Sequence, residues 1–195
     1  MEIAPRIIAV VKTPLRPLRH GAVAITRGIL LDRLFSRSDI PHNLVISTGG
    51  AGTTFLMKHL SQFVQINDFF DRDNLKHLPH LPEGWVENKR ILYVYDEPTA
   101  VFLSIKRRKF VHKHAGELGC LACQFTWGRL RQKLFERAVR KQIEAFHAYR
   151  SDNVMLLAYD DIWNRLEEVS AFFGIDDDRF VCEFPPRRPR KSHHK

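Results

Sequence analysis

The sequence predicts an α/β fold of three layers, in which a mainly parallel sheet is flanked by helices on both faces. Short apolar runs typical of strands alternate along the chain with longer segments whose apolar residues recur at helical spacing. Strands that alternate with helices form parallel sheets, which are covered on both faces. A length of 195 residues with 44% hydrophobic content suits one domain with its own core.

The chain divides into three regions by composition. Residues 1–43 form a basic arm, residues 44–180 form the α/β domain, and residues 181–195 form a tail rich in Pro and Arg that we expect to be loose. Apolar spacing over residues 22–35 of the arm predicts an amphipathic helix. We favour packing of this helix on the core, with contact to a membrane surface as the alternative.

Local patterns place the elements of the domain. Apolar, β-branched and aromatic residues make 90–95 the clearest strand, while Asp and Pro between 68 and 88 indicate a loop. Pro98 suits the first turn of a helix, and Gly174 suits the residue that follows one. In chain order we expect strands at 43–47, 63–66, 90–95 and 154–159, and helices at 55–60, 98–109, 127–149 and 166–173.

Charge and composition restrict the class of partner. The formal net charge is +9, and residues 101–150 hold twelve Lys or Arg against three acids. This region is either a solvated basic face or an electrostatic funnel toward an anion site. A run of about 18 apolar residues, as a membrane-spanning helix needs, does not occur, and three Cys do not make a disulfide scaffold. We therefore expect a cytoplasmic protein, with peripheral membrane contact as an alternative, and no nucleic-acid partner.

A Gly-rich turn over residues 48–54 joins the first strand to its helix. Successive backbone N–H groups in such a turn point into one concavity, and the helix start adds partial positive charge, so the pattern favours phosphate binding. Thr53 and Thr54 could add hydroxyl donors. The turn lacks the Lys of a Walker A loop, which disfavours an ordinary ATP or GTP hydrolase. The alternative is a tight connection that binds no ligand.

Four short segments occur in an order that resembles the sulfotransferase family. They are Gly52-Thr53-Thr54-Phe55, Tyr93 to Pro98 followed by Ser104, Tyr159 to Ile162, and Phe172 to Ile175. The resemblance covers residues 43–176 and implies a P-loop-like fold. It also implies that the donor co-substrate is 3′-phosphoadenosine-5′-phosphosulfate (PAPS), and that no metal ion is needed.

The resemblance also implies roles for individual residues. Ser104 would bind the 3′-phosphate, while Phe55 and Tyr159 would line the adenine pocket. His77, in a Lys-His-Leu-Pro segment, would be the general base on the acceptor, with His80 as the next candidate; neutral His suits proton removal near pH 7. The 5′-phosphosulfate would be held by the turn residues Gly49, Gly50, Ala51, Gly52, Thr53 and Thr54.

Two positions depart from the pattern of the family. Gly50 stands where the family has Lys or Arg for the charge on the leaving phosphate, and Asp96 stands where it has Arg for the 3′-phosphate. A carboxylate beside a phosphate is unfavourable. We expect Lys106, Arg107 or Arg108, or else the cations of the tail, to replace the missing Arg.

A further cluster of possible metal ligands lies at His112, His114, Cys120 and Cys123. Four such residues within twelve positions could hold zinc, and the Cys-x-x-Cys pair could be redox-active. Because Gly116 and Gly119 indicate a flexible loop, we favour ordinary free thiols and expect no metal.

Two functions of different classes follow. The first is transfer of a sulfuryl group from PAPS to a hydroxyl or amine acceptor on a small molecule or glycan. The alternative is a catalytically degenerate binding module of the same fold for an anionic ligand such as a glycan, a nucleotide or a membrane surface. A P-loop kinase-like activity is the third interpretation.

Overall fold

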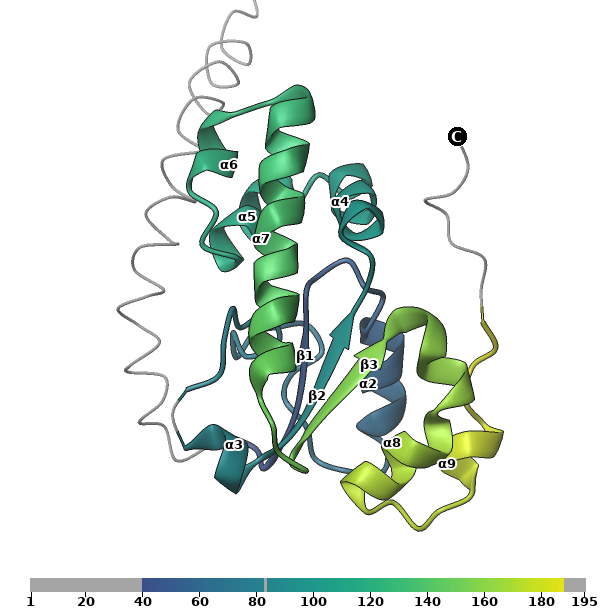
Figure 1. The fold of residues 1–195 in the computed structure, drawn as a ribbon. Helices are drawn as coiled ribbons and strands as arrows, with labels where there is room; N and C mark the ends of the chain where they lie inside the picture. The colour runs from purple at the N-terminus through teal and green to yellow at the C-terminus, as the bar shows by residue number, and fades with distance from the viewer. Residues whose placement is uncertain (1–39, 83, 188–195) are drawn as a thin grey trace, which may run out of the picture.

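The core of the fold is a small parallel sheet. The structure is a computed structural model that describes residues 40–82 and 84–187. In this part of the chain the strands β1 (Asn43–Ser47), β2 (Arg90–Tyr95) and β3 (Val154–Ala158) lie in the order β1-β2-β3. Ser47 pairs with Val94, and Tyr95 with Ala158. The three strands therefore end at one edge of the sheet (Figure 1).

Helices connect the strands and cover the sheet (Figure 1). A predicted α/β fold with a parallel sheet flanked by helices is confirmed. The elements besides the strands are α2 (Thr54–Leu60), α3 (Trp85–Asn88), α4 (Pro98–Arg107), α5 (Val111–Glu117), α6 (Ala122–Phe125), α7 (Gly128–Ala148), the 3-10 helix η1 (Tyr159–Asn164), α8 (Leu166–Phe173) and α9 (Arg179–Cys182).

Each face of the sheet has its own hydrophobic cluster, because successive side chains of a strand point to opposite faces. Val45, Leu92 and Leu157 pack with side chains of α2, α8 and α9. On the opposite face, the strand residues pack with the segment 75–85 and with the C-terminal part of α7. There the ring of Tyr93 stacks on that of Phe146, with 3.8 Å between centroids. The central strand residues are buried and those of β3 are mostly half-buried, which explains why the strands are mainly apolar.

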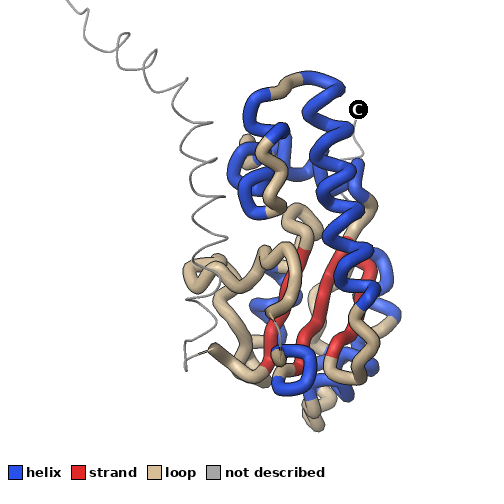
Figure 2. The backbone as a smooth tube through the Cα atoms, turned by 60° about the vertical axis from the view of Figure 1, so that its left-hand side comes forward, coloured by secondary structure: helices blue, strands red, loops and turns tan. Residues whose placement is uncertain are grey.

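A helical unit of α4, α5, α6 and the N-terminal part of α7 lies beyond the carboxyl ends of the strands (Figures 1 and 2). It has its own core, to which Val101, Phe102, Cys123, Phe135 and Val139 contribute. This unit covers the end of the sheet at which the strands have their carboxyl ends and at which the Gly-rich turn lies. It is therefore the part of the fold that can enclose a site there.

Two expectations about elements are wrong. The strand expected at 63–66 is reduced to one parallel bridge between Asn43 and Ile66. Its place beside β1 is taken by a side chain: the amide of Asn67 accepts from the Val45 N–H (2.7 Å) and donates to the Val45 carbonyl (3.1 Å). The segment 68–88, expected to be mainly loop, is confirmed as such in its described residues, with the short helix α3 at its end.

The second wrong expectation concerns the segment around Gly116 and Gly119, expected to be a flexible loop. It contains α5 and α6, and Gly116 lies buried inside α5. Burial of His114, Ala115 and Glu117 on the same helix offsets the low helix propensity of Gly. Tertiary packing therefore decides the structure of this segment.

The two ends of the chain are only partly described. The helix expected over residues 22–35 lies outside the described residues. At the other end, the chain is held by contacts as far as Arg187: Phe184 is buried, the Trp163 indole donates to the Pro185 carbonyl (2.9 Å), and Arg187 pairs with Asp160 (2.5 Å). Residues 181–187, expected to be part of a loose tail, are therefore held by contacts, and residues 188–195 lie outside the described residues. Among the helices of the described ranges, none has the length and apolar character needed to cross a membrane.

The Tyr93–Phe146 stack provides a test of the core. Phe146→Ala should lower the free energy of unfolding by about 3–5 kcal/mol, because a buried ring is removed and a cavity remains. Phe125→Ala is the matched control, since Phe125 is 59% exposed, and should change it by less than about 0.5 kcal/mol. Urea denaturation followed by circular dichroism measures both. Equal losses would show that α7 is not anchored on the sheet through Phe146.

Candidate functional site

The Gly-rich turn is a tightly packed loop at the carboxyl end of β1. Gly49 and Gly52 have positive φ values of 74° and 66°. A Cβ atom at Gly52 would lie 2.7 Å from the ring of Tyr159, and one at Gly49 would lie 2.6 Å from Nδ1 of His114. Glycine is therefore required here for close approach as well as for the backbone conformation.

A cavity of about 200 Å³ opens beside this turn. Its wall combines the turn, the segment 69–77, the end of α4 and the helix α5, which are far apart in the sequence. The lining residues are Gly50, Gly52, Thr53, Thr54, Phe69, Phe70, Asp71, Lys76, His77, Arg108, Phe110, Lys113 and His114. Three cationic side chains therefore face this space together with one carboxylate, which makes it suited to an anion.

Lys76 is the most constrained of these cations. It is buried, and its ammonium donates to Thr54 Oγ1 (3.0 Å) and to the Phe69 carbonyl (2.9 Å). Burial lowers its pKa to about 8, although Asp71 opposes this shift. In the sequence the turn itself has no cation, because Gly50 stands where the family has Lys or Arg. The structure corrects this, since Lys76 brings a positive charge to the same turn from another segment.

Arg108 is the one of the three expected substitute cations that lines the cavity. Its Nε donates to the Ser104 carbonyl (3.2 Å), and a terminal nitrogen lies 3.5 Å from Ser104 Oγ. Lys106 and Arg107 are exposed and do not line it. Asp96, at the position of the family's Arg, accepts from the Glu97 N–H (2.7 Å) and also lies outside the lining.

His77 reaches the cavity because its backbone is held on two sides. The Ser47 N–H donates to the Lys76 carbonyl (2.8 Å), and the side chain of Gln142 donates to the Leu78 carbonyl (2.6 Å). Nδ1 of His77 lies 3.0 Å from the Ser47 carbonyl. Since a carbonyl only accepts, Nδ1 carries the proton, and Nε2 is left with a lone pair.

Burial lowers the pKa of His77 to about 3, against the opposing influence of Glu117. The imidazole is therefore neutral at physiological pH. His80, the other candidate base, is exposed and does not line this cavity.

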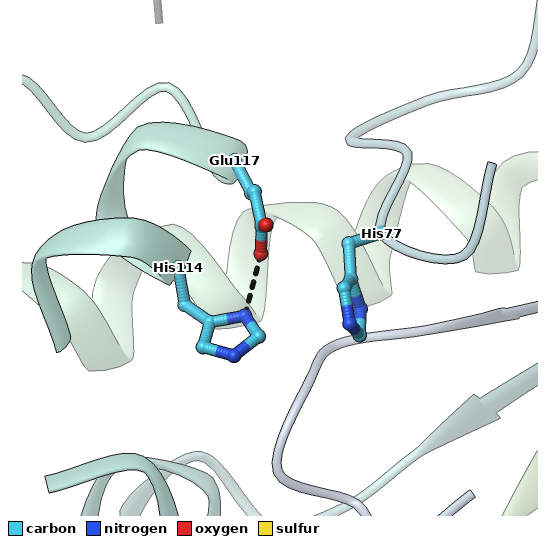
Figure 3. A group of neighbouring side chains, drawn as sticks. All are labelled: His77, His114 and Glu117. Atoms are coloured by element: carbon cyan, nitrogen blue, oxygen red, sulfur yellow. Dashed lines mark ion pairs between the residues drawn. The ribbon is translucent and has the colours of Figure 1, made fainter. Parts of the chain in front are cut away.

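His114 and Glu117 lie opposite His77 (Figure 3). Nδ1 of His114 lies 2.6 Å from Glu117 Oε2, and the rings of His77 and His114 are 4.9 Å apart, nearly perpendicular. Burial alone would raise the pKa of Glu117. The hydrogen bond from His114 and the nearby charges of His77, His114 and Lys113 outweigh it and hold that pKa below its usual range.

The remaining predicted site residues lie around the cavity or away from it. Tyr159 packs on Gly52 and meets the ring of Phe55 edge-on at 6.3 Å, while Phe55 stacks on Trp163 at 5.5 Å. Ala51 is buried and Ser104 is half-buried. The structure thus brings Gly50, Gly52, Thr53, Thr54 and His77 to one cavity, with Gly49 and Tyr159 beside it, and does not bring Ala51, Phe55 or Ser104 to its lining.

The four possible zinc ligands named from the sequence do not form one site. Cys120 and Cys123 are joined in a disulfide, so the favoured interpretation as free thiols is wrong. Nδ1 of His112 lies 3.0 Å from Gln124 Oε1, and His114 pairs with Glu117. His114 therefore belongs to the cavity beside the turn.

Sequence reasoning missed Lys76, Asp71, Lys113 and Glu117 as site residues. Lys76 directly precedes His77, so the Lys-His-Leu-Pro segment that indicated His77 could also have indicated Lys76. Lys113, His114 and Glu117 have helical spacing and share one side of α5. That spacing was hidden because two glycines made the segment look like a loop.

A second cavity, of about 610 Å³, is lined by residues that follow those of the first cavity in the sequence and by residues of α7. Pro79, His80 and Leu118 line it, together with Arg137 and Lys141 of α7. It is larger than the first cavity, but it holds none of the turn residues and neither His77 nor His114. Size alone therefore does not identify the functional site here.

No family model, curated protein or solved structure matches this chain.

The packing around Gly50 determines how a side chain at this position would affect the stability of the protein. A Cβ atom there would lie 3.0 Å from the Val101 carbonyl and from the side chain of Ile105. Gly50→Lys should therefore destabilise the protein by about 1–3 kcal/mol more than a matched change, because overpacking adds to the strain of a positive φ. The matched control is Gly119→Lys, with φ 68° and open space. Thermal and urea unfolding compare the two; equal losses would contradict this packing.

Proposed function

We propose that this protein is a sulfotransferase that moves a sulfuryl group from PAPS to a hydroxyl or amine acceptor. The observation that carries the proposal is the convergence of the Gly-rich turn, His77 and three cations on one cavity. Gly50, Gly52, Thr53, Thr54 and His77 were assigned to one reaction from their sequence patterns, and they line the same space.

The cavity suits the charged end of the donor. A site for a whole drug-sized ligand has about 300–1,000 Å³, so a space of about 200 Å³ fits a phosphosulfate, with the nucleoside outside it. Thr53, Thr54 and the turn provide neutral donors, while Lys76 and Arg108 provide charge. Phe55, Tyr159 and Trp163 form an aromatic group beside Gly52, where a base can stack.

His77 is placed for the proton transfer. Its Nε2 lone pair takes the proton of the acceptor O–H or N–H, and the acceptor's electron pair forms the new bond to sulfur. The bond from sulfur to the bridging phosphate oxygen breaks, and that oxygen keeps the electron pair. Lys76 and Arg108 stabilise the charge that develops on the leaving phosphate. A neutral, buried His77 is a weak base, but the negative donor beside it raises its pKa.

A binding module without transfer is the second candidate. Asp71 faces the cavity, and Asp96 replaces the family's Arg, so the site has fewer cations for the nucleotide than the family pattern expects. In that case adenosine 3′,5′-bisphosphate binds, but no acceptor is sulfated. Incubation with ³⁵S-labelled PAPS and a panel of phenols, alcohols and amino sugars, together with calorimetric binding of the bisphosphate, separates the two functions.

The role of Lys76 is tested by binding alone. Lys76→Met should weaken adenosine 3′,5′-bisphosphate by roughly tenfold to a hundredfold, because a hydrogen bond to a charged group contributes about 1.5–3 kcal/mol. Lys106→Met removes the same charge from the exposed side of α4 and should change the affinity less than threefold. Isothermal titration calorimetry measures both. Equal weakening would mean that only long-range charge matters, and that the ligand lies elsewhere.

The role of His77 is tested by the rate. His77→Asn keeps much of the shape and removes the base, so transfer should fall by about 10²–10⁴-fold while the affinity for the bisphosphate barely changes. His80→Asn, three residues away and exposed, should leave both unchanged. Single-turnover transfer of ³⁵S to an active acceptor from the panel gives the rates. A full rate in His77→Asn would remove His77 from the mechanism.

A further inference from the structure

We propose that His77, His114 and Glu117 form a binding site for a zinc-class divalent ion. One nitrogen of each imidazole and one oxygen of the carboxylate all lie within 4.8 Å of one another. Figure 3 shows the three side chains converging on a common space. A small inward movement brings such atoms to the distances of about 2.0–2.2 Å that zinc requires. This inference goes beyond the proposed function and does not rest on it.

The three residues are held by separate parts of the fold. His114 and Glu117 lie one turn apart on α5 and are each only 6% exposed. His77 comes from the segment that β1 and α7 hold through the carbonyls of Lys76 and Leu78. Two of the three side chains are buried and His77 is half-buried, which sets this cluster apart from the acidic groups that gather on protein surfaces. Its ligand atoms lie close together before a metal ion arrives.

The chemistry of the donors selects the class of metal. Two imidazoles and one carboxylate are the ligands of many catalytic zinc sites, which keep a fourth position open. Mg²⁺ and Ca²⁺ prefer sites made wholly of oxygen. Since His77 and His114 line the 200 Å³ cavity, the fourth position borders that space.

The hydrogen bonds around His77 suit a metal ligand. Its Nδ1 lies 3.0 Å from the Ser47 carbonyl, which orients the ring and leaves Nε2 for the ion. Histidine ligands in metalloproteins generally donate their other ring N–H in this way, and the partner raises the basicity of the ligand. This contact is not evident from the sequence, because Ser47 and His77 are 30 positions apart.

Two groups compete with the ion. Nδ1 of His114 and Oε2 of Glu117 are 2.6 Å apart, so a proton joins them and must leave before both bind the metal. The Lys113 ammonium lies 3.4 Å from Glu117 Oε1, and it can move into solvent because the side chain is 51% exposed. Removal of Lys113 should therefore strengthen metal binding, a result that a purely structural role of the cluster does not give.

The test is a zinc titration of the full-length protein, stripped with chelator and kept without reductant, in competition with a chromogenic zinc indicator. We expect one ion per chain to be lost, or bound at least tenfold more weakly, in His77→Ala, His114→Ala and Glu117→Gln. His80→Ala is the control and should match the wild type. Other histidines contribute equally to every variant, so the differences report the cluster.

Cobalt provides a second readout. Co²⁺ in a site of low coordination number gives strong visible absorption, which should appear in the wild type and be lost in Glu117→Gln. Zinc binding with the same affinity in all three ligand variants would overturn the proposal. If His114→Ala does not fold, Lys113→Met still decides it: severalfold tighter binding supports a metal at Glu117, and unchanged binding contradicts it.

Failure of this proposal and failure of the proposed function are distinguishable. The titration needs neither PAPS nor an acceptor, so it gives its result even if no transfer is found. Because the ion and the acceptor proton need the same Nε2 lone pair, zinc should block transfer at saturation. Full transfer by a zinc-saturated protein would count against His77 as the base, while the metal site would stand on the titration.

Discussion

The outer edge of β1, the edge that does not face β2, is the constraint on which the rest of the site depends. In the described structure no long strand pairs with this edge, yet buried backbone groups must find hydrogen-bond partners. The side chain of Asn67 satisfies both polar groups of Val45, and the Lys76 carbonyl satisfies the N–H of Ser47. These bonds fix both ends of the loop that connects them. Lys76 and His77 therefore arrive at the Gly-rich turn as a consequence of sheet chemistry.

Charge in a confined space is the second organising feature. Lys76 is desolvated, and its ammonium is held by two neutral acceptors, Thr54 Oγ1 and the Phe69 carbonyl. Arg108 and Lys113 add to the repulsion that lowers the pKa of Lys76, and Asp71 relieves it in part. An anion bound in the cavity would offset this repulsion. These neighbouring positive charges therefore favour a phosphate or sulfate ligand in the cavity.

Elements with strong local patterns could be predicted from the sequence, whereas those decided by distant contacts could not. The strand at 90–95 and the helices at 127–149 and 166–173 have clear periodicity or end signals, and the structure has them within a residue or so. The strand at 63–66 was predicted from apolar content alone, and Asn67 took its place. Within the site, the turn and His77 have motifs, but Glu117 has none until α5 is known to be a helix.

The same geometry that makes His77 a candidate base also makes it a candidate ligand. Both roles need a neutral imidazole, a fixed ring and an exposed lone pair, and the Ser47 carbonyl supplies the orientation for each. The group that lies beside the His77 imidazole decides between the two roles. An anionic donor in the cavity stabilises a proton on His77, while Glu117, one side chain away, stabilises a cation shared with His114. The Lys113 ammonium lies between Asp71 and Glu117. While it remains there, its positive charge favours an anion in the cavity over a metal ion at Glu117.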